Sequence, residues 1–254
     1  MPQQKPYNQI VLFGDSLFQG CSEAKGGFSF QGALQHLCMR KLDVINRGFS
    51  GYNTNNALEL LPEIFLPPSA TNTRIEYLLV LLGANDACLP VETSSQGVPI
   101  DQYKENLIKI ITHEHIKAHN PKILLVTPPP LDEFQSLRTD LANGHKEAVR
   151  KAAVSARYSE TARQVAAEVP GVILIDLQKE LMQKAVDMTP DFDPSGPQLG
   201  YPGGKRGALE HLLPDGLHMN GEAYKVLFDI VAPHIELPID TVYPDWRIMN
   251  PGNI

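Results

Sequence analysis

Five short strand candidates alternate with helical segments along the whole chain, and this alternation limits the fold more than any other feature. The candidates lie at residues 10–13, 43–46, 77–82, 123–126 and 172–175. Strands that alternate with helices form βαβ units, in which the strands are parallel and the crossovers are right-handed. The sequence therefore predicts a three-layer α/β/α sandwich around a five-stranded parallel sheet of flavodoxin-like order.

Apolar residues at helical spacing predict the segments between the strands. The expected helices cover residues 28–41, 54–65, 101–120 and 143–168, then the chain from the fifth strand to 188, and finally 221–235. Thr54 is the expected N-cap of the second helix, and Asn120-Pro121 is expected to end the third. No internal repeat and no linker interrupts the pattern, so residues 1–254 are expected to form a single domain with an extended C-terminal tail at 237–254.

Charge and composition exclude several classes of partner. The net charge of −7 argues against nucleic acid or an anionic membrane surface. The first residues carry no basic-then-apolar signal, and no run approaches the ~18 apolar residues of a membrane helix. Three cysteines without CxxC spacing, Cys21, Cys38 and Cys88, indicate reduced thiols rather than a disulfide framework. We therefore expect a cytoplasmic protein that acts without a membrane partner.

Short polar blocks follow the first three strands. They are 14–16 (Gly-Asp-Ser), 47–51 (Arg-Gly-Phe-Ser-Gly) and 83–86 (Gly-Ala-Asn-Asp), and a fourth block, 215–218 (Asp-Gly-Leu-His), precedes the last helix. Each block alone is more typical of a turn or a helix cap than of a functional site. In a parallel sheet, however, the carboxyl ends of the strands lie along one edge, where ligands bind. The topology therefore brings the first three blocks together, and the fourth can approach the same edge.

These blocks contain the groups that acyl transfer requires. A serine needs a base to become a nucleophile. His218 can accept the proton of Ser16, and Asp215 can hold the other ring nitrogen of His218. An oxyanion needs preorganised donors, and three are available: the backbone N–H of Ser16, the backbone N–H of Gly51 and the side-chain amide of Asn85. Glycine at position 51 lets a substrate approach the backbone closely.

Two other chemistries fit the sequence less well. A metal site lacks a second histidine or a carboxylate cluster at ligand spacing, so we expect no metal and no other cofactor. A flavodoxin-like module that binds a nucleotide or phosphate without catalysis lacks a Gly-x-Gly-x-x-Gly or phosphate loop after the first strand. That alternative would also leave Asn85 and His218 without a role.

The four blocks, in this order and spacing, resemble those of the SGNH hydrolases, the GDSL esterase and lipase family. The signature residues of that family fall here on Ser16, Gly51, Asn85 and His218. Residues 46–54 (Asn-Arg-Gly-Phe-Ser-Gly-Tyr-Asn-Thr) and 215–219 (Asp-Gly-Leu-His-Met) are similar in particular to the isoamyl acetate-hydrolysing esterase branch. The resemblance implies a flavodoxin-like sandwich, no metal, and hydrolysis of acyl esters through a Ser-His-Asp arrangement.

We therefore expect a serine esterase that hydrolyses short-chain carboxylic esters such as acetates through an acyl-enzyme. A lysophospholipase, a thioesterase or a deacetylase of sugar esters is the alternative within the enzymes. An inactive scaffold of the same fold is disfavoured because every catalytic position is filled.

The surroundings of the site give weaker signals. Phe49, Tyr52, Pro129 and Leu217 are expected to line the substrate pocket. Residues 189–214, rich in Pro and Gly, form either a wall or lid of that pocket or a solvated loop. The tail carries Tyr243, Trp246, Ile248 and Met249, which is too apolar for a free coil. It is expected to pack on its own domain or on a second subunit, with a dimer contact favoured.

Overall fold

A single parallel sheet forms the centre of the molecule. The computed structural model describes residues 6–71, 73–239, 243 and 246–249. Its strands are β1 (Asn8–Gly14), β2 (Leu42–Gly48), β3 (Ile75–Leu81), β4 (Lys122–Val126) and β5 (Val172–Ile175). They lie in the order β2-β1-β3-β4-β5, and each neighbouring pair is parallel. This is the predicted flavodoxin-like order.

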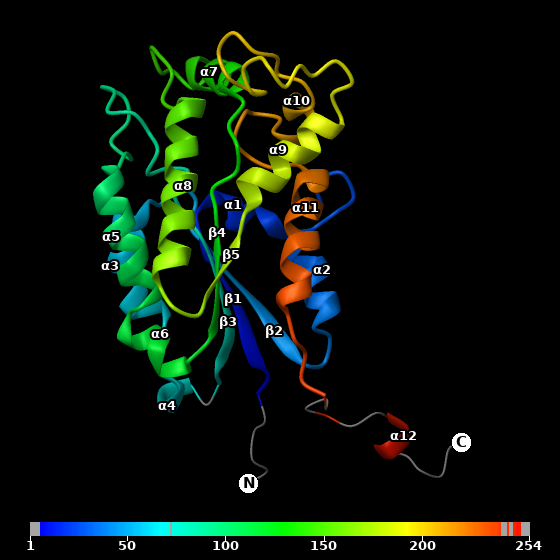
Figure 1. Cartoon of the computed structure of the whole chain (residues 1–254). Coiled ribbons are helices and arrows are strands. Elements are labelled where there is room, and N and C mark those ends of the chain that lie inside the picture. The colour runs from blue at the N-terminus through cyan, green and yellow to red at the C-terminus, as the bar shows by residue number, and fades with distance from the viewer. Residues whose placement is uncertain (1–5, 72, 240–242, 244–245, 250–254) are drawn as a thin grey trace.

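Helices cover both faces of the sheet (Figure 1). The layer on one face consists of α3 (Thr54–Ile64), α5 (Ile100–Ile111) and α8 (Ala152–Glu168). The layer on the other consists of α2 (Phe30–Leu37), α9 (Leu177–Asp187) and α11 (Gly221–Val231). Six further α-helices lie in the described part of the chain: α1 (Ser16–Gln19), α4 (Pro68–Thr71), α6 (Glu114–His119), α7 (Glu133–Ala142), α10 (Leu209–Leu212) and α12 (Trp246–Met249). The predicted three-layer sandwich is confirmed.

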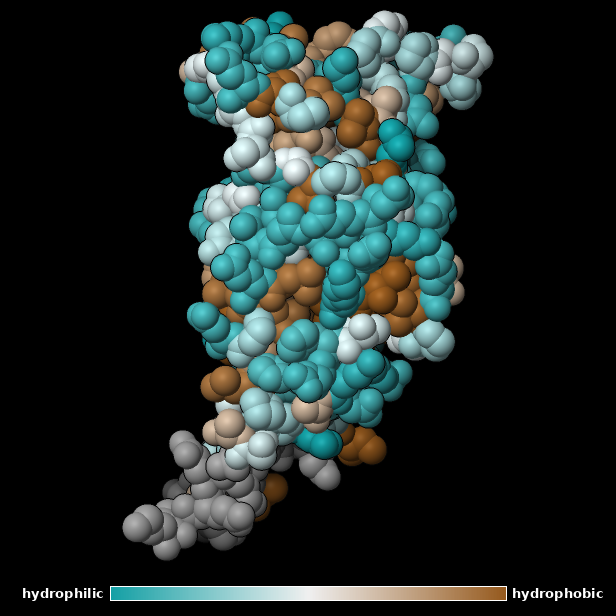
Figure 2. All heavy atoms as spheres, turned by 90° about the vertical axis from the view of Figure 1, so that its left-hand side faces the viewer, coloured by the Kyte–Doolittle hydropathy of each residue, from teal (hydrophilic) through white to brown (hydrophobic). Residues whose placement is uncertain are grey.

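Two hydrophobic cores, one on each face of the sheet, explain why the strands are continuously apolar. In β1, Ile10 and Leu12 belong to the core under α2, α9 and α11, whereas Val11 and Phe13 belong to the core under α3, α5 and α8. Fully burying a side chain of this kind contributes about 1.5–3 kcal/mol. Figure 2 shows the outward side of the α3/α5/α8 layer, where hydrophilic residues cover most of the surface and apolar ones are visible between them.

The helix predicted at 143–168 is wrong in its first third. α8 begins only at Ala152, and a separate helix, α7, precedes it. Gly144 has a φ of +91°, which ends the helical path after α7. Asp140 then accepts a hydrogen bond from the backbone N–H of Val149 at 2.8 Å, which closes the connection between the helices into a loop. In α7 the buried residues are Ser136 and Asp140, whereas Leu137 and Leu141 are exposed, so the apolar side chains do not mark its buried face.

Two further helix predictions need correction. The segment 101–120 is not one helix, because α5 ends at Ile111 and α6 starts at Glu114. Its predicted end holds, since Asn120 is a left-handed C-cap with φ +51°. The N-cap of α3 is Asn53 rather than Thr54. The Asn53 side chain accepts from the N–H of Asn56, and the Asn56 side chain accepts from the N–H of Asn53, which forms a capping box.

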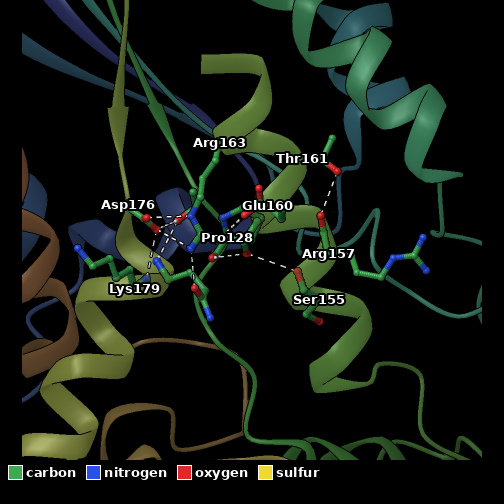
Figure 3. A network of polar contacts seen from close by, with 11 residues as sticks. Pro128, Ser155, Arg157, Glu160, Thr161, Arg163, Asp176 and Lys179 are labelled. Carbon is green, nitrogen blue, oxygen red and sulfur yellow. Dashed lines mark hydrogen bonds and ion pairs between the residues drawn. The ribbon is translucent and has the colours of Figure 1, made fainter. Parts of the chain in front are cut away.

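A cluster of polar contacts ties the ends of β4 and β5 to α8 (Figure 3). Arg163 Nε and Nη2 each donate at 2.8 Å to the carboxylate of Asp176, which precedes α9. Ser159 Oγ donates to the carbonyl of Pro128 at 3.0 Å. These bonds fix the chain that leaves the carboxyl edge of the sheet after β4.

The described part of the tail starts against its own domain. Lys41 Nζ donates to the carbonyl of Pro238, and Arg40 Nη2 donates to the carbonyl of Tyr243 at 3.0 Å. The apolar side chains of Tyr243, Trp246, Ile248 and Met249 are exposed. Residues 240–242, 244–245 and 250–254 of the predicted tail lie outside the described residues. Within the described ranges, no helix is long and apolar enough to cross a membrane.

The end of β2 provides a test of this packing. A Cβ at Gly48 would lie 2.0 Å from the backbone nitrogen of Gln19 and 2.6 Å from its Cα, so Gly48→Ala forces β2 and α1 apart. We expect a loss of about 3 kcal/mol, the upper end of the usual overpacking range, measured as a lower urea midpoint. Gly196→Ala is the control, since its added Cβ makes only ordinary contact at 3.5 Å. Equal midpoints for the two variants would contradict the packing.

Candidate active site

Ser16 follows the carboxyl end of β1, which lies between β2 and β3 in the sheet. The strand ends at Gly14, where an added Cβ would lie 2.3 Å from the carbonyl oxygen of Leu81, so the backbones of β1 and β3 approach too closely for any side chain. Asp15 is extended and accepts a hydrogen bond from the N–H of Leu17 at 2.9 Å. This N-cap starts α1 with Ser16 as its first residue, so the N–H of Ser16 has no acceptor inside the helix.

A chain of hydrogen bonds connects Ser16, His218 and Asp215. Ser16 Oγ lies 2.8 Å from His218 Nε2, and His218 Nδ1 lies 2.5 Å from Asp215 Oδ2. The other carboxylate oxygen of Asp215 accepts from the N–H groups of Leu217 and His218 at 2.9 and 2.7 Å. The same side chain therefore shapes the turn and orients the imidazole. The structure brings together all three residues that the sequence analysis paired.

The hydrogen bonds of Asp215 keep it ionised. Its partial burial would raise the pKa, but the bond to the His218 ring, the charge of that ring and the two backbone N–H groups outweigh burial. The pKa of Asp215 falls to about 2. A carboxylate that stays charged at neutral pH holds the Nδ1 proton of the imidazole and leaves Nε2 to face Ser16.

The turn that carries His218 is held by α7. The carbonyl of Gly216 accepts from the N–H of Asp132 at 2.9 Å, and the carbonyl of Asp215 accepts from Thr139 Oγ1 at 3.0 Å. Gly216 has a φ of +92°, and a Cβ there would lie 2.3 Å from the backbone nitrogen of Ser136. The helix that the sequence analysis missed is therefore the support of the predicted base.

Residues 189–214 also pack on α7. Arg206 Nε donates to the buried Asp132 at 2.9 Å, and the carbonyl of Gly200 accepts from the N–H of Glu133 at 3.0 Å. The end of the segment also contacts the turn of His218 directly, since the carbonyl of Leu213 accepts from the N–H of Gly216 at 2.9 Å. Whether it forms a lid stays a prediction.

Gly51 and Asn85 are joined through their loops. Asn85 Nδ2 donates to the carbonyl of Tyr52 at 2.9 Å, one residue after Gly51. Gln96 Nε2 donates to the carbonyl of Gly51 at 2.9 Å, and Gly51 has a φ of +82°, which favours glycine. The second N–H of Asn85 Nδ2 has no acceptor in the part of the chain that the structure describes. That N–H is available to a bound ligand.

The sequence analysis missed two side chains that hold these loops. Gln19, at the end of α1, accepts the N–H of Ser50 at 2.8 Å. Arg150, in the loop before α8, donates from Nη2 to Asn85 Oδ1 at 2.8 Å. Neither belongs to a motif, and Arg150 lies in a segment that was expected to be helix. No local signal in the sequence would have identified them.

Two carboxyl groups are buried beside the site. Asp15 and Asp86 are each 0% exposed, and one oxygen of each has no hydrogen-bond partner among the described residues. Burial, reinforced by the charge of Asp86, raises the pKa of Asp15 to about 7. Burial also raises the pKa of Asp86 to about 6, although Thr54 donates two hydrogen bonds to it.

A hollow adjoins Gly51. It has a volume of about 470 Å³, and its walls are Ser50, Gly51, Tyr52, Asn56, Glu59, Leu60 and Glu63. Of the four predicted pocket residues, Tyr52 lines this hollow, and Phe49 stacks on Tyr52 with ring centroids 5.2 Å apart. Pro129 is buried and Leu217 is half-buried, and neither lines the hollow. Their contact with a substrate stays a prediction.

Comparison with known proteins identifies the relatives of the chain. The model of the GDSL-like lipase/acylhydrolase family matches residues 12–226. The isoamyl acetate-hydrolyzing esterase 1 homolog of Bos taurus is 31% identical over 243 residues, which cover 94% of this chain and 87% of that protein. The isoamyl acetate-hydrolyzing esterase of Saccharomyces cerevisiae is 27% identical over 253 residues, covering 96% and 91%.

Solved structures share the fold. A lipase/acylhydrolase from Enterococcus faecalis superposes with a TM-score of 0.60 at 22% identity and covers 92% of this chain and 98% of its own. An acetyl xylan esterase superposes with a TM-score of 0.62 at 17% identity, covering 90% and 100%.

The buried Asp15 predicts a pH dependence of stability. Because folding raises its pKa from 3.8 to about 7, its favourable contribution is complete below pH 3.8 and is lost as the pH rises through 7. Asp15→Asn keeps the oxygen that caps α1 but cannot ionise. We expect the difference in melting temperature, variant minus wild type, to be larger at pH 8 than at pH 5. A difference that does not change with pH would mean that Asp15 is not the group concerned.

Proposed function

The chain belongs to the GDSL-like lipase/acylhydrolase family and is a carboxylic ester hydrolase, and we propose that it hydrolyses short-chain esters such as acetates through an acyl-enzyme on Ser16. The observation that carries the proposal is the continuous hydrogen-bond chain from Ser16 Oγ through the His218 ring to Asp215. A serine hydroxyl is a weak nucleophile until an adjacent base removes its proton, and this arrangement supplies the base and the group that orients it.

In the proposed reaction, Ser16 Oγ attacks the ester carbonyl while His218 Nε2 takes the hydroxyl proton. Asp215 stabilises the imidazolium that forms. The negative charge that develops on the carbonyl oxygen is stabilised by the N–H of Ser16, the N–H of Gly51 and the amide of Asn85. His218 then gives its proton to the departing alcohol, and the acyl group stays on Ser16. Water, activated by His218, releases the acid and restores the serine.

The preference for small neutral esters is supported by the hollow beside Gly51 and by the relatives. Glu59 and Glu63 place two carboxylates on the wall of that hollow, which disfavours an anionic ester beside them. The relatives from Bos taurus and Saccharomyces cerevisiae are named for isoamyl acetate, a short neutral ester. The two carboxylates favour neutral esters over anionic ones, and the names of the relatives favour a simple alcohol over a sugar.

We further propose a cytoplasmic location and a dimer contact through the tail. Cys21, Cys38 and Cys88 are free and buried, which suits a reducing compartment. Trp246, Ile248 and Met249 are exposed on α12, and a second subunit would cover them.

The role of Ser16 predicts a large effect of a single substitution. Hydrolysis of p-nitrophenyl acetate by Ser16→Ala should fall by at least about 10⁴-fold in kcat, because removal of a serine nucleophile disables the whole catalytic unit. The control is Ser69→Ala. Ser69 belongs to α4, which lies at the end of the sheet away from α1 (Figure 1), so this variant should retain wild-type activity. A Ser16→Ala variant as active as the wild type would refute the mechanism, and an inactive wild type would favour the scaffold reading.

The proposed substrate class predicts a chain-length profile. With p-nitrophenyl acetate, butyrate and octanoate, we expect kcat/KM of the wild-type enzyme to be highest for the acetate or butyrate and lowest for the octanoate. A profile that rises steadily to the octanoate would contradict the proposal of short-chain esters and indicate a lipase-like site.

A further inference from the structure

We propose that Arg150 is a positioning residue that fixes the orientation of the Asn85 amide, so that its N–H rather than its oxygen faces the substrate carbonyl. The inference rests on the proposed function, in which Asn85 is an oxyanion donor. Arg150 Nη2 donates to Asn85 Oδ1 at 2.8 Å, and Arg150 Nε donates to the carbonyl of Ala84 at 2.8 Å. One guanidinium therefore holds both the side chain of Asn85 and the backbone just before it.

A side-chain amide needs such support because its two ends are alike in shape and opposite in function. The NH₂ end donates hydrogen bonds and the oxygen accepts them. If the amide turned over, its oxygen would face the developing oxyanion and repel it. It would also face the carbonyl of Tyr52, while the NH₂ group would face the guanidinium. Arg150 and the Tyr52 carbonyl together make the turned-over orientation unfavourable at both ends.

Arg150 can play this part because the backbone on both sides of it is fixed. The N–H of Val149 donates to Asp140 Oδ2 at 2.8 Å, and the carbonyl of Val149 accepts from the N–H of Leu89 at 2.8 Å. On the other side, the N–H of Ala152 donates to Glu133 Oε2 at 2.8 Å. Asp140 and Glu133 belong to α7, so the helix that supports His218 also places Arg150.

The positive charge of Arg150 strengthens its hydrogen bond to Asn85. Among the described residues, no carboxylate pairs with the Arg150 guanidinium. Its hydrogen bonds within the described residues go to the Ala84 carbonyl and the Asn85 amide oxygen, both neutral acceptors. Hydrogen bonds from a charged donor are about twice as strong as those between neutral groups. A half-buried arginine that binds an amide rather than an acid suits orientation better than ion pairing.

A double-mutant cycle tests the proposal. Arg150→Met should lower kcat for p-nitrophenyl acetate about 10- to 100-fold and change KM less than about threefold, because the lost interaction acts on the oxyanion. Asn85→Ala should lower kcat about 10²- to 10³-fold, as for the loss of one oxyanion donor. The double variant should be no more than about threefold worse than Asn85→Ala alone, because Arg150 acts only through Asn85.

Two further variants keep the cycle interpretable. Arg157→Met, which removes an exposed arginine of α8, should retain the wild-type kcat. Arg150→Lys keeps a positive charge in the same space but cannot bond Ala84 and Asn85 with one planar fork. It should lose at least about fivefold in kcat, again with no further loss when combined with Asn85→Ala. It serves for the cycle if Arg150→Met fails to fold.

The outcomes separate this inference from the proposed function. If the losses of the Arg150 and Asn85 variants multiply, Arg150 acts independently of Asn85 and the inference is overturned. An unchanged kcat in both Arg150 variants overturns it as well. If Asn85→Ala is fully active while Ser16→Ala is inactive, the serine esterase stands and the role of Arg150 falls. If Ser16→Ala is active, the proposed function itself fails.

Discussion

The contact between Ser16 and His218 joins residues 202 positions apart, and the position of the last helix makes it possible. α11 lies directly on the segment that follows Ser16. Tyr224 donates to the carbonyl of Leu17 at 2.7 Å, and a Cβ at Gly221 would lie 1.7 Å from the carbonyl oxygen of Lys25. Any larger residue at 221 would move α11 outward and carry His218 away from Ser16. The contact between Ser16 and His218 is therefore a consequence of how α11 packs on the chain that follows β1.

The polar groups around the site are placed at a cost in stability. Asp15 and Asp86 are buried in surroundings that raise the pKa of both carboxyl groups. Desolvating an ionisable group without full pairing is unfavourable. The two hydrophobic cores compensate for this cost, since they enclose both faces of all five strands. Strained or poorly paired groups of this kind concentrate at functional sites, where local rules of stability are broken.

The sequence predicted the parts of the molecule whose signals are local. The apolar runs gave all five strands, and the sheet order followed from the rules for βαβ units, as the structure confirms. Topology placed Ser16 at the edge where strand ends meet. The approach of Asp215 and His218 to that edge was expected from the order and chemistry of the blocks, and the structure brings the three residues together. Boundaries were less secure. Thr54 was expected as an N-cap but instead donates to Asp86, while Asn53 caps the helix.

The parts that could not be predicted depend on contacts between distant segments. α7 buries polar residues and exposes two of its leucines, and its place is set by hydrogen bonds from Asp132 and Thr139 to the turn at 215–216. Arg150 reaches its partners because bonds from distant residues, among them Asp140 and Glu133, fix the loop before α8. The residues next to α7 and next to Arg150 in the sequence give no sign of these hydrogen bonds. The wrong helix prediction at 143–151 and the omission of Arg150 therefore have the same cause. A segment predicted as helix was not considered as a loop that could hold a site residue.

The three proposed oxyanion donors differ in how much support they need. The N–H groups of Ser16 and Gly51 belong to the backbone, so the start of α1 and the loop after β2 fix them directly. The amide of Asn85 is separated from the backbone by two rotatable bonds. Other groups must restrain rotation about both bonds if the donor is to be preorganised. The Tyr52 carbonyl restrains one end of the amide, and Arg150 restrains the other. A side-chain donor at this position therefore requires an ordered loop behind it, which is what α7 and the segment before α8 provide. The proposed role of Asn85 in catalysis therefore depends on the fold around residue 150 as much as on the asparagine itself.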